Sequence, residues 1–378
     1  MKVGGLVQLA LLGAALLAVT RVQALPVGAK VQTKAFVSPR AMERHLEVHG
    51  HRGGRGEANE ETLAAYADAF LAGATHLEWD VGITSDGVPI AWHDENIQAA
   101  KCLDPPSGDH VVGKYIANVT LSQIKSLDCG AQRLGSDFML QQTRKGARIQ
   151  TLDQVFTFAQ CVDAGLPAAK KIRFNIESKL SPPTPNTTVG PQVFVDKMYA
   201  AFRKHRVVDR VVFQSFDWRT LQLMGEQHPE VVLSALVSSD ASYLEPIWLG
   251  GIDLNQQPGS TLAQRIVHAA KSINATYLSP NHNLNGTEVN QPGYAPFVDT
   301  DMVRAAHDVD MKVIPYTPDS LDTAEKLVYT HGVDGLITDY PTTFTAWARS
   351  RGFQLPQKRD VVRVQRCLKE ARARDDEP

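Results

Sequence analysis

Two histidines, His51 and His93, flank the motif Glu78-x-Asp80 in the first third of the sequence. Histidine exchanges a proton near neutral pH, and paired carboxylates bind hard cations such as Mg²⁺ or Ca²⁺. An acid–base pair beside a cation site is typical of phosphoryl-transfer chemistry. The segment from residue 51 to residue 94 therefore indicates a candidate active site.

A later segment, N-I-E-S-K, adds Glu177 as a third carboxylate and Lys179 as a cation. Three oxygen donors suit Mg²⁺ or Ca²⁺ and suit zinc poorly, because no cysteine shares the faces of the strands expected to carry them. Arg52 precedes the first glycine-rich turn. Arg52 and Lys179 can contact phosphate oxygens, although a surface ion pair is the simpler interpretation of each.

Each of these residues also has a purely structural interpretation. An E-x-D pair commonly lies on a solvated strand edge, but here Leu77, Trp79 and Val81 alternate with it. Burying unpaired carboxylates among apolar side chains costs roughly several kcal/mol, which favours a function. A lone histidine is usually a hydrogen-bonded structural residue, and His49 competes with His51 because residues two apart share a strand face.

Strands and helices alternate along the sequence. The first strand is expected to end at His51 before the glycine-rich turn at 53–56, and Asp319 is expected to cap a helix. The other expected strands cover residues 76–83, 88–92, 171–177, 211–214, 231–237, 276–278, 312–316 and 335–339. The expected helices cover residues 62–73, 120–127, 151–164, 191–205, 217–227, 262–272, 301–309, 319–331 and 343–350.

This alternation predicts a parallel sheet covered by helices. The number of units is close to eight, and the candidate residues follow strand ends, so we predict a (β/α)8 TIM barrel. A doubly wound sheet is the alternative, but neither G-x-G-x-x-G nor G-K-[ST] is present. Residues 95–150, rich in Pro and Gly, interrupt the pattern and are interpreted as a small insertion after the second βα region.

The chain has 378 residues, which fits two average domains or one barrel with an insertion. Residues 1–24 read as a signal peptide, because the apolar run after Lys2 is too short to span a membrane and ends in small residues. The expected organisation continues with a lead-in at 25–45, the barrel at 46–350 and a charged tail at 351–378. The net charge of −2 gives no reason to expect a nucleic-acid partner.

A secreted or periplasmic location gives the cysteines an oxidising environment. Four cysteines allow three pairings; Cys102 and Cys129 flank one irregular segment, which favours their pairing and leaves Cys161 with Cys367. Glycosylation sequons occur at Asn118, Asn186, Asn274 and Asn285. No later segment is apolar enough for stable membrane insertion, and the sequence says nothing of the oligomeric state.

The ordered motifs resemble those of the glycerophosphodiester phosphodiesterase family. They are His51-Arg52-Gly53, E-x-T-L-A-A at 60–65, L-E-W-D-V at 77–81, T-S-D-G at 84–87, His93-Asp94, N-I-E-S-K at 175–179, Gln214-Ser215-Phe216, and K-V-I-P-Y-T with G-V-D-G-L-I-T-D-Y-P at 312–341. The resemblance extends over residues 46–345. It departs from the family at 59–62, which reads N-E-E-T in place of P-E-N-T, and at Tyr316, where family members carry Trp.

The resemblance implies a TIM barrel that hydrolyses small glycerophosphodiesters to glycerol 3-phosphate and an alcohol, with Mg²⁺ or Ca²⁺ as cofactor. It implies an acid–base pair, His51 and His93, that acts through a cyclic phosphate. The implied metal ligands are Glu78, Asp80 and Glu177, and the implied substrate contacts are Arg52, Lys179, Gln214 and Tyr316.

Two other functions fit part of the same pattern. Secreted sphingomyelinase D-type phospholipases have a similar barrel with two histidines and a metal, although the T-S-D-G and N-I-E-S-K motifs favour the glycerol branch. A barrel that binds a ligand without catalysis is the other alternative, and the retention of every candidate group argues against it. The head-group preference is not predicted.

Overall fold

The structure, a computed structural model, describes residues 44–136 and 138–375. The predicted signal peptide lies outside the described residues, as does nearly all of the predicted lead-in. Among the described residues, no helix combines the length and the apolar character needed to cross a membrane.

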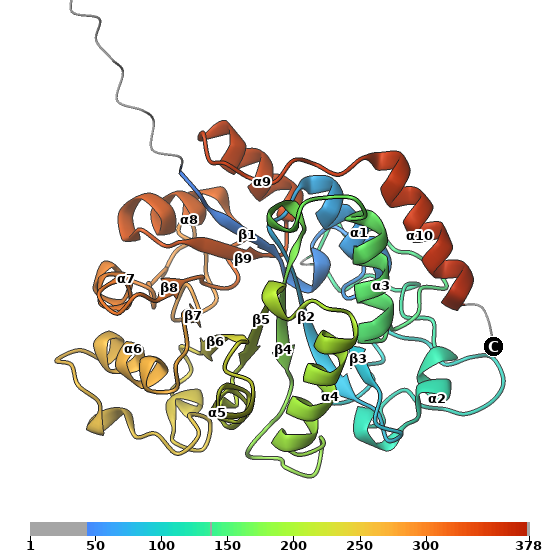
Figure 1. Cartoon of the computed structure of the whole chain (residues 1–378), viewed down its shortest axis with the longest axis horizontal. Helices are drawn as coiled ribbons and strands as arrows, with labels where there is room; N and C mark the ends of the chain where they lie inside the picture. Colours follow the sequence, from blue (N-terminus) through green and yellow to red (C-terminus); the bar gives the residue numbers. More distant parts are fainter. Residues whose placement is uncertain (1–43, 137, 376–378) are drawn as a thin grey trace, which may run out of the picture. The chain divides into compact units, whose positions relative to one another are not determined.

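Eight parallel strands follow one another in the order β8-β7-β6-β5-β4-β2-β1-β9 (Figure 1). They are β1 (Glu47–Gly50), β2 (His76–Ile83), β4 (Arg173–Ser178), β5 (Val211–Ser215), β6 (Val232–Val237), β7 (Tyr277–Pro280), β8 (Lys312–Val313) and β9 (Gly335–Thr338). Just beyond β8, Tyr316 pairs in parallel with Ile337 of β9, and the Ile337 backbone N–H donates to the Pro315 carbonyl oxygen at 2.9 Å. The sheet is thus a nearly closed barrel, which confirms the predicted TIM-barrel fold.

Helices alternate with the strands and surround the barrel (Figure 1). They are α1 (Leu63–Ala72), α3 (Leu152–Val162), α4 (Pro191–Lys204), α5 (Trp218–Gln227), α6 (Leu262–Ser272), α7 (Thr300–His307), α8 (Leu321–Glu325), which continues as a π-helical segment (Lys326–His331), and α9 (Pro341–Ser350). Threonine side chains cap several of them: Thr62 accepts from the Ala65 N–H, and Thr151 forms a capping box with Gln154.

The alternation along β2 divides its side chains between two environments. Leu77 and Trp79 pack in the main core, where Trp79 contacts Phe156 of α3 edge-on at 5.7 Å. Glu78 and Asp80 have the opposite direction and lie in the barrel interior, because side chains repeat every second residue. The alternation of apolar residues with Glu78 and Asp80 therefore places the two carboxylates on the same face of β2.

The predicted strand at 88–92 is present as β3 (Pro89–Ala91), but it is not a barrel strand. It pairs antiparallel with β2, Val81 opposite Ala91, after a turn that contains Gly87 at φ 76°. The hairpin carries the chain back along β2, and the Trp92 N–H donates to the Asp80 carbonyl oxygen at 3.0 Å. This reversal brings His93 back beside Asp80.

The insertion lies between β3 and α3 and has an apolar core of its own, which includes Ile97, Val111 and Ile124. It contains a short helix, α2 (Leu121–Lys125). A disulfide joins Cys102 to Cys129 within it, and a second joins Cys161 to Cys367. Both disulfides agree with the pairing that the sequence favoured.

The expected helix cap at Asp319 was wrong. Ser320, not Asp319, caps α8 by accepting from the Thr323 N–H at 3.3 Å. The Asp319 carboxylate instead accepts from the backbone N–H of Asp339 at 3.0 Å. A carboxylate one residue before a cap can reach a neighbouring strand end, and here that contact replaces the cap.

The charged end of the chain is not simply a tail. It contains α10 (Val361–Asp375), which packs on α1 and α3. Val364, Cys367, Leu368 and Ala371 are buried at helical spacing. The many charges between these residues concealed an amphipathic helix, which the Cys161–Cys367 disulfide joins to α3.

Candidate active site

The carboxyl ends of the strands meet around a cavity of about 210 Å³. All nine residues chosen from the sequence border it: His51, Arg52, Glu78, Asp80, His93, Glu177, Lys179, Gln214 and Tyr316. They come from the ends of β1, β2, β4, β5 and β8 and from the residues after β3. In a parallel barrel such positions converge at one mouth, which is where barrel enzymes place their active sites.

Glu78, Asp80 and Glu177 form a carboxylate trio at the floor of this cavity. One oxygen from each lies within 4.8 Å of the others, and all three side chains are buried. Burial, together with the Asp80 carboxylate, raises the pKa of Glu78 well above its usual range. Burial also raises the pKa of Glu177 to about 8, although Lys179 opposes the shift. Like charges in a dry site resist joint ionisation, so the trio favours an added cation.

A divalent cation fits this trio. Its donors are carboxylate oxygens alone, the set that Mg²⁺ and Ca²⁺ prefer. Within the described part of the chain, the buried Asp80 Oδ2 accepts no hydrogen bond and has the ion-pair contact with Arg52 Nε at 3.2 Å, so this carboxylate keeps lone pairs for a cation. Asp80 is also the charged member: burial works against its ionised form, but His93, Lys179 and Arg52 hold its pKa well below the usual range.

Arg52 organises the trio from the first βα turn, η1 (His51–Gly53). Its backbone has φ 50°, and its N–H donates to Glu78 Oε2 at 2.8 Å. Its guanidinium lies 3.1 Å from Glu60 Oε1 and 3.2 Å from Asp80 Oδ2. The cation predicted for phosphate is therefore already paired with two buried carboxylates.

Lys179 follows β4 and is more accessible than Arg52, since their side chains are 19% and 8% exposed. Its Nζ lies 2.9 Å from Glu177 Oε1 and 3.7 Å from Asp80 Oδ1, and it faces the Phe216 ring at 5.8 Å. Burial would lower the pKa of this amine, but the two carboxylates raise it above its ordinary value. Lys179 is therefore a fixed positive charge at neutral pH.

Each histidine of the cavity is backed by an aspartate. His51 Nδ1 lies 2.5 Å from Asp339 Oδ1, and His93 Nδ1 lies 3.2 Å from Asp94 Oδ1. These contacts occupy Nδ1 and leave Nε2 of each ring for a substrate proton. Burial lowers the pKa of His51, and burial with the charges of Arg52 and Lys179 lowers that of His93 to about 3. Both rings are thus neutral near pH 7, the form that accepts a proton.

Gln214 and Tyr316 border the cavity, but their polar groups form hydrogen bonds with other residues of the protein. Gln214 Nε2 donates to Glu78 Oε1 at 2.7 Å, and its Oε1 accepts from Asn175 Nδ2 at 3.0 Å. The Tyr316 hydroxyl donates toward Asn281 Oδ1 at 2.9 Å, and its ring meets Phe216 edge-on. In this structure Gln214 orients the trio, and Tyr316 forms a wall.

His49, which competed with His51 in the sequence, lies elsewhere. It is fully buried in the barrel interior, and its Nδ1 accepts from Asn175 Nδ2 at 3.2 Å. It does not border the cavity that contains His51. The choice of His51 over His49 agrees with this placement.

Sequence reasoning assigned no role to several charged residues of the site. Asp339 supports His51 from the end of β9, and its Oδ2 lies 3.4 Å from Arg55 Nε. Glu61 is buried and accepts from the Asp80 N–H at 3.0 Å, while burial and the Asp80 charge raise its pKa well above the usual range. Lys101, from the insertion, pairs with Asp94 and with Glu60. Asp339 and Glu60 lie inside quoted motifs, so a signal existed; Lys101 had none.

The fold and the site define a class of protein, a TIM-barrel enzyme with a carboxylate trio and two histidines at its mouth. Residues 51–343 match the glycerophosphoryl diester phosphodiesterase family. The chain therefore belongs to this family, and it is a phosphoric diester hydrolase.

Individual relatives agree with the family. The glycerophosphodiester phosphodiesterase of Caldanaerobacter subterraneus is 26% identical over 305 residues, which are 81% of this chain and 98% of that protein. Glycerophosphodiester phosphodiesterase 1 of Rattus norvegicus is 35% identical over 112 residues, 29% of each chain. A solved structure from Silicibacter pomeroyi has a TM-score of 0.63 and 24% identity and covers 86% of this chain and 94% of its own. It supports the barrel fold.

Proposed function

We propose that this enzyme hydrolyses glycerophosphodiesters to glycerol 3-phosphate and a free alcohol, with Mg²⁺ or Ca²⁺ at the carboxylate trio. The observation that carries the proposal is the single cavity bordered by the trio, two aspartate-backed histidines and Lys179. A phosphodiesterase of Oleispira antarctica, with a TM-score of 0.56, 21% identity and coverage of 79% of this chain and 95% of its own, is a complex with the product sn-glycerol-3-phosphate. That complex supports the same product for this chain.

The bound cation would polarise a phosphoryl oxygen and offset negative charge at phosphorus. Lys179 contacts a second phosphoryl oxygen, because its charged amine borders the cavity and is more exposed than the Arg52 guanidinium. Arg52 acts chiefly by holding Glu78 and Asp80 in place, since its own charge is already paired. Tyr316 and Phe216 limit the width of the cavity beside Lys179.

The two histidines move the protons. His51 removes the proton from the glycerol hydroxyl, whose oxygen forms a bond to phosphorus while the bond to the leaving alcohol breaks. Asp339 favours this role, because its charge stabilises the imidazolium that forms on His51. His93, neutral in the free protein, gains a proton as the negative phosphodiester binds beside it, and it then protonates the departing alcohol. Water then opens the cyclic phosphate with the two roles reversed.

The test is turnover of glycerophosphocholine and glycerophosphoethanolamine after EDTA treatment, with and without added Mg²⁺ or Ca²⁺. We expect activity only with metal, and a loss of about 100-fold or more in His51→Ala with unchanged folding. The matched control is His205→Ala. It removes a histidine that is also paired with an aspartate, Asp153, but does not border the cavity. Near-normal turnover by His51→Ala refutes the assignment, and faster turnover of sphingomyelin or lysophosphatidylcholine points to the sphingomyelinase D-type alternative.

We also propose that the protein is secreted and glycosylated. Two disulfides and four exposed sequon asparagines, Asn118, Asn186, Asn274 and Asn285, support this proposal. The expected result is a protein recovered from the culture medium with Leu25 as its first residue. A cytosolic protein that retains its first residues contradicts the proposal.

A further inference from the structure

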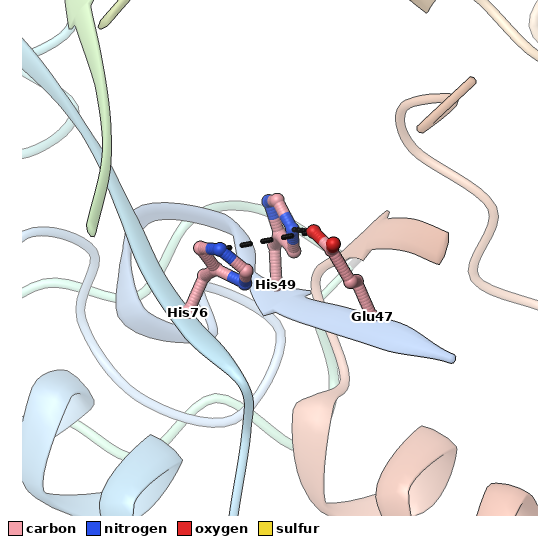
Figure 2. A group of neighbouring side chains, drawn as sticks. All are labelled: Glu47, His49 and His76. Atoms are coloured by element: carbon pink, nitrogen blue, oxygen red, sulfur yellow. Dashed lines mark hydrogen bonds and ion pairs between the residues drawn. The ribbon is translucent and has the colours of Figure 1, made fainter. Parts of the chain in front are cut away.

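Figure 2 shows a second group of ionisable side chains. It lies at the amino-terminal end of the barrel, because β1 begins at Glu47 and β2 at His76. Glu47 and His49 belong to β1, and His76 begins β2, where it pairs in register with His49. Both imidazoles are at most 1% exposed, and their ring centroids are 3.9 Å apart. Figure 2 shows both rings turned toward the Glu47 carboxylate.

His76 has an unused nitrogen that faces this carboxylate. Its Nδ1 lies 2.9 Å from the Thr75 hydroxyl, which itself donates to the Val48 carbonyl oxygen at 2.9 Å. Because the Thr75 hydroxyl donates its proton to Val48, it can only accept from His76. His76 Nδ1 is therefore the donor, and His76 Nε2 presents a lone pair. Within the described part of the chain Nε2 has no hydrogen-bond partner, and it lies 3.7 Å from Glu47 Oε2. The fully buried Nε2 of His76 and the Glu47 carboxylate, whose side chain is 17% exposed, are two acceptors that face each other, and this favours a cation between them.

The spacing of the three donors fits a small transition metal. Glu47 Oε2 lies 3.1 Å from His49 Nε2 and 3.7 Å from His76 Nε2, and one donor from each residue lies within 4.8 Å of the others. A tetrahedral ion with bonds of about 2.0–2.1 Å separates its ligand atoms by roughly 3.4 Å. Small side-chain shifts therefore suffice to place all three around one ion.

We propose that Glu47, His49 and His76 form a second metal site, which binds a nitrogen-preferring divalent ion such as Zn²⁺. Two imidazoles and one carboxylate are a ligand set typical of zinc and poor for Mg²⁺ or Ca²⁺. Glu47 and His76 border a cavity of about 830 Å³ at this end of the barrel, which gives an ion access. Two cations reduce the affinity: Lys312 pairs with Glu47 Oε1, and Arg173 borders the same cavity. The site is therefore expected to bind the ion reversibly.

The second site is linked to the carboxylate trio by a buried chain of hydrogen bonds, a step that rests on the proposed function of Glu78. Gln214 donates to Glu78, Asn175 donates to Gln214 and to His49 Nδ1, and His49 Nε2 contacts Glu47. A metal on His49 Nε2 moves the ring proton to Nδ1. The protonated Nδ1 then needs an acceptor, but it faces the Asn175 Nδ2 donor. Asn175 and Gln214 must turn their amides to compensate, and Gln214 then directs an oxygen at Glu78. Metal in the second site thus opposes metal at the trio.

The test uses the full mature chain, stripped with EDTA and titrated with Co²⁺ alone. A four-coordinate nitrogen-containing site absorbs visible light far more strongly than a six-coordinate oxygen site. We expect a strong band that saturates at about one equivalent in the wild type and in a Glu78→Gln/Glu177→Gln variant. Glu47→Gln and His76→Gln should lose the band, and His205→Gln should keep it. Glu47→Gln retains a polar group for Lys312, so it serves even where His76→Gln fails to fold.

A wild-type protein without the band, or a band that survives both Glu47→Gln and His76→Gln, overturns the second site. Failure of the proposed function is separate, because it appears as activity indifferent to Mg²⁺ or Ca²⁺ while the band remains. For the linkage, saturating Mg²⁺ should raise the apparent Kd for Co²⁺ about fivefold or more in the wild type and not in Gln214→Met. Equal Kd values with and without Mg²⁺ in the wild type refute the linkage.

Discussion

The contact between His51 and Asp339 gives the most specific prediction for catalysis. The two side chains are 14% and 6% exposed and 2.5 Å apart, so water screens their interaction weakly. Burial lowers the pKa of His51, and the Asp339 charge opposes that shift. Asp339→Asn preserves the size of the side chain and removes the charge. It should therefore weaken His51 as a base without disturbing the barrel.

The magnitude follows from the kind of bond that is lost. A hydrogen bond to a charged group contributes about 1.5–3 kcal/mol, and about 1.4 kcal/mol corresponds to a tenfold change in rate. We therefore expect kcat to fall about 10- to 100-fold. Without the Asp339 charge the pKa of His51 is lower still, so the acidic limb of the kcat/KM profile should move to lower pH. The measurement is glycerophosphocholine turnover as a function of pH.

The matched control is Asp153→Asn, which alters another aspartate–histidine pair, 2.8 Å from His205, outside the cavity. Its turnover and pH profile should equal those of the wild type. Two results for Asp339→Asn would refute the reasoning: activity within about twofold of the wild type, or a lower rate with an unmoved acidic limb. The second would mean that His51 is not the group whose neutral form the reaction requires.

Three further predictions concern the metal, the polar chain and the second disulfide. The pKa of Glu177 is raised from 4.5 to about 8 in the metal-free protein, so its contribution to stability is present below pH 4.5 and is lost as the pH rises through 8. The gain in Tm from added Mg²⁺ or Ca²⁺, measured by thermal shift, should therefore grow as the pH rises from 4.5 to 8. This gain should vanish in Glu177→Gln. Gln214→Met leaves Glu78 without its 2.7 Å donor, and the Kd for activating metal should rise about 10- to 100-fold, while an unchanged Kd would leave Gln214 without a positioning role. The Cys161→Ser/Cys367→Ser variant should lose about 2–5 kcal/mol of stability in chemical denaturation yet keep its kcat, because α10 does not border the cavity.

The parts of the site that the sequence predicted share a local signal. Glu78 and Asp80 alternate with core residues on β2, Glu177 follows the same pattern on β4, and Lys179 comes directly after that strand. A strand period of two and the rule that parallel strands end together suffice to gather them. Asp339 lies inside a family motif, but strand period does not reveal its partner, because it meets His51 across 288 positions of the chain. Closure of the barrel creates that contact, and no local pattern encodes it.

The fold was predictable to a similar extent. Periodicity located the barrel strands and helices, because each alternates between core and solvent or between core and barrel interior. It did not reveal the direction of β3, since an antiparallel hairpin and a parallel βα unit begin with the same apolar strand. It also missed α10, where Val364, Cys367 and Ala371 are dispersed among charged residues.

The charges around the cavity explain why the insertion is part of the site. Carboxylates outnumber cations among the residues that surround it: Glu60, Glu61, Glu78, Asp80, Asp94, Glu177 and Asp339 against Arg52, Arg55, Lys101 and Lys179. A divalent cation at the trio reduces the excess beside Glu78 and Glu177, whose pKa values are raised by burial and, to a smaller extent, by the neighbouring Asp80 carboxylate. Lys101 reduces it at the other side, because it pairs with both Glu60 and Asp94. The insertion therefore neutralises the carboxylates beside Arg52 and His93, and so it helps to hold these two residues at the cavity.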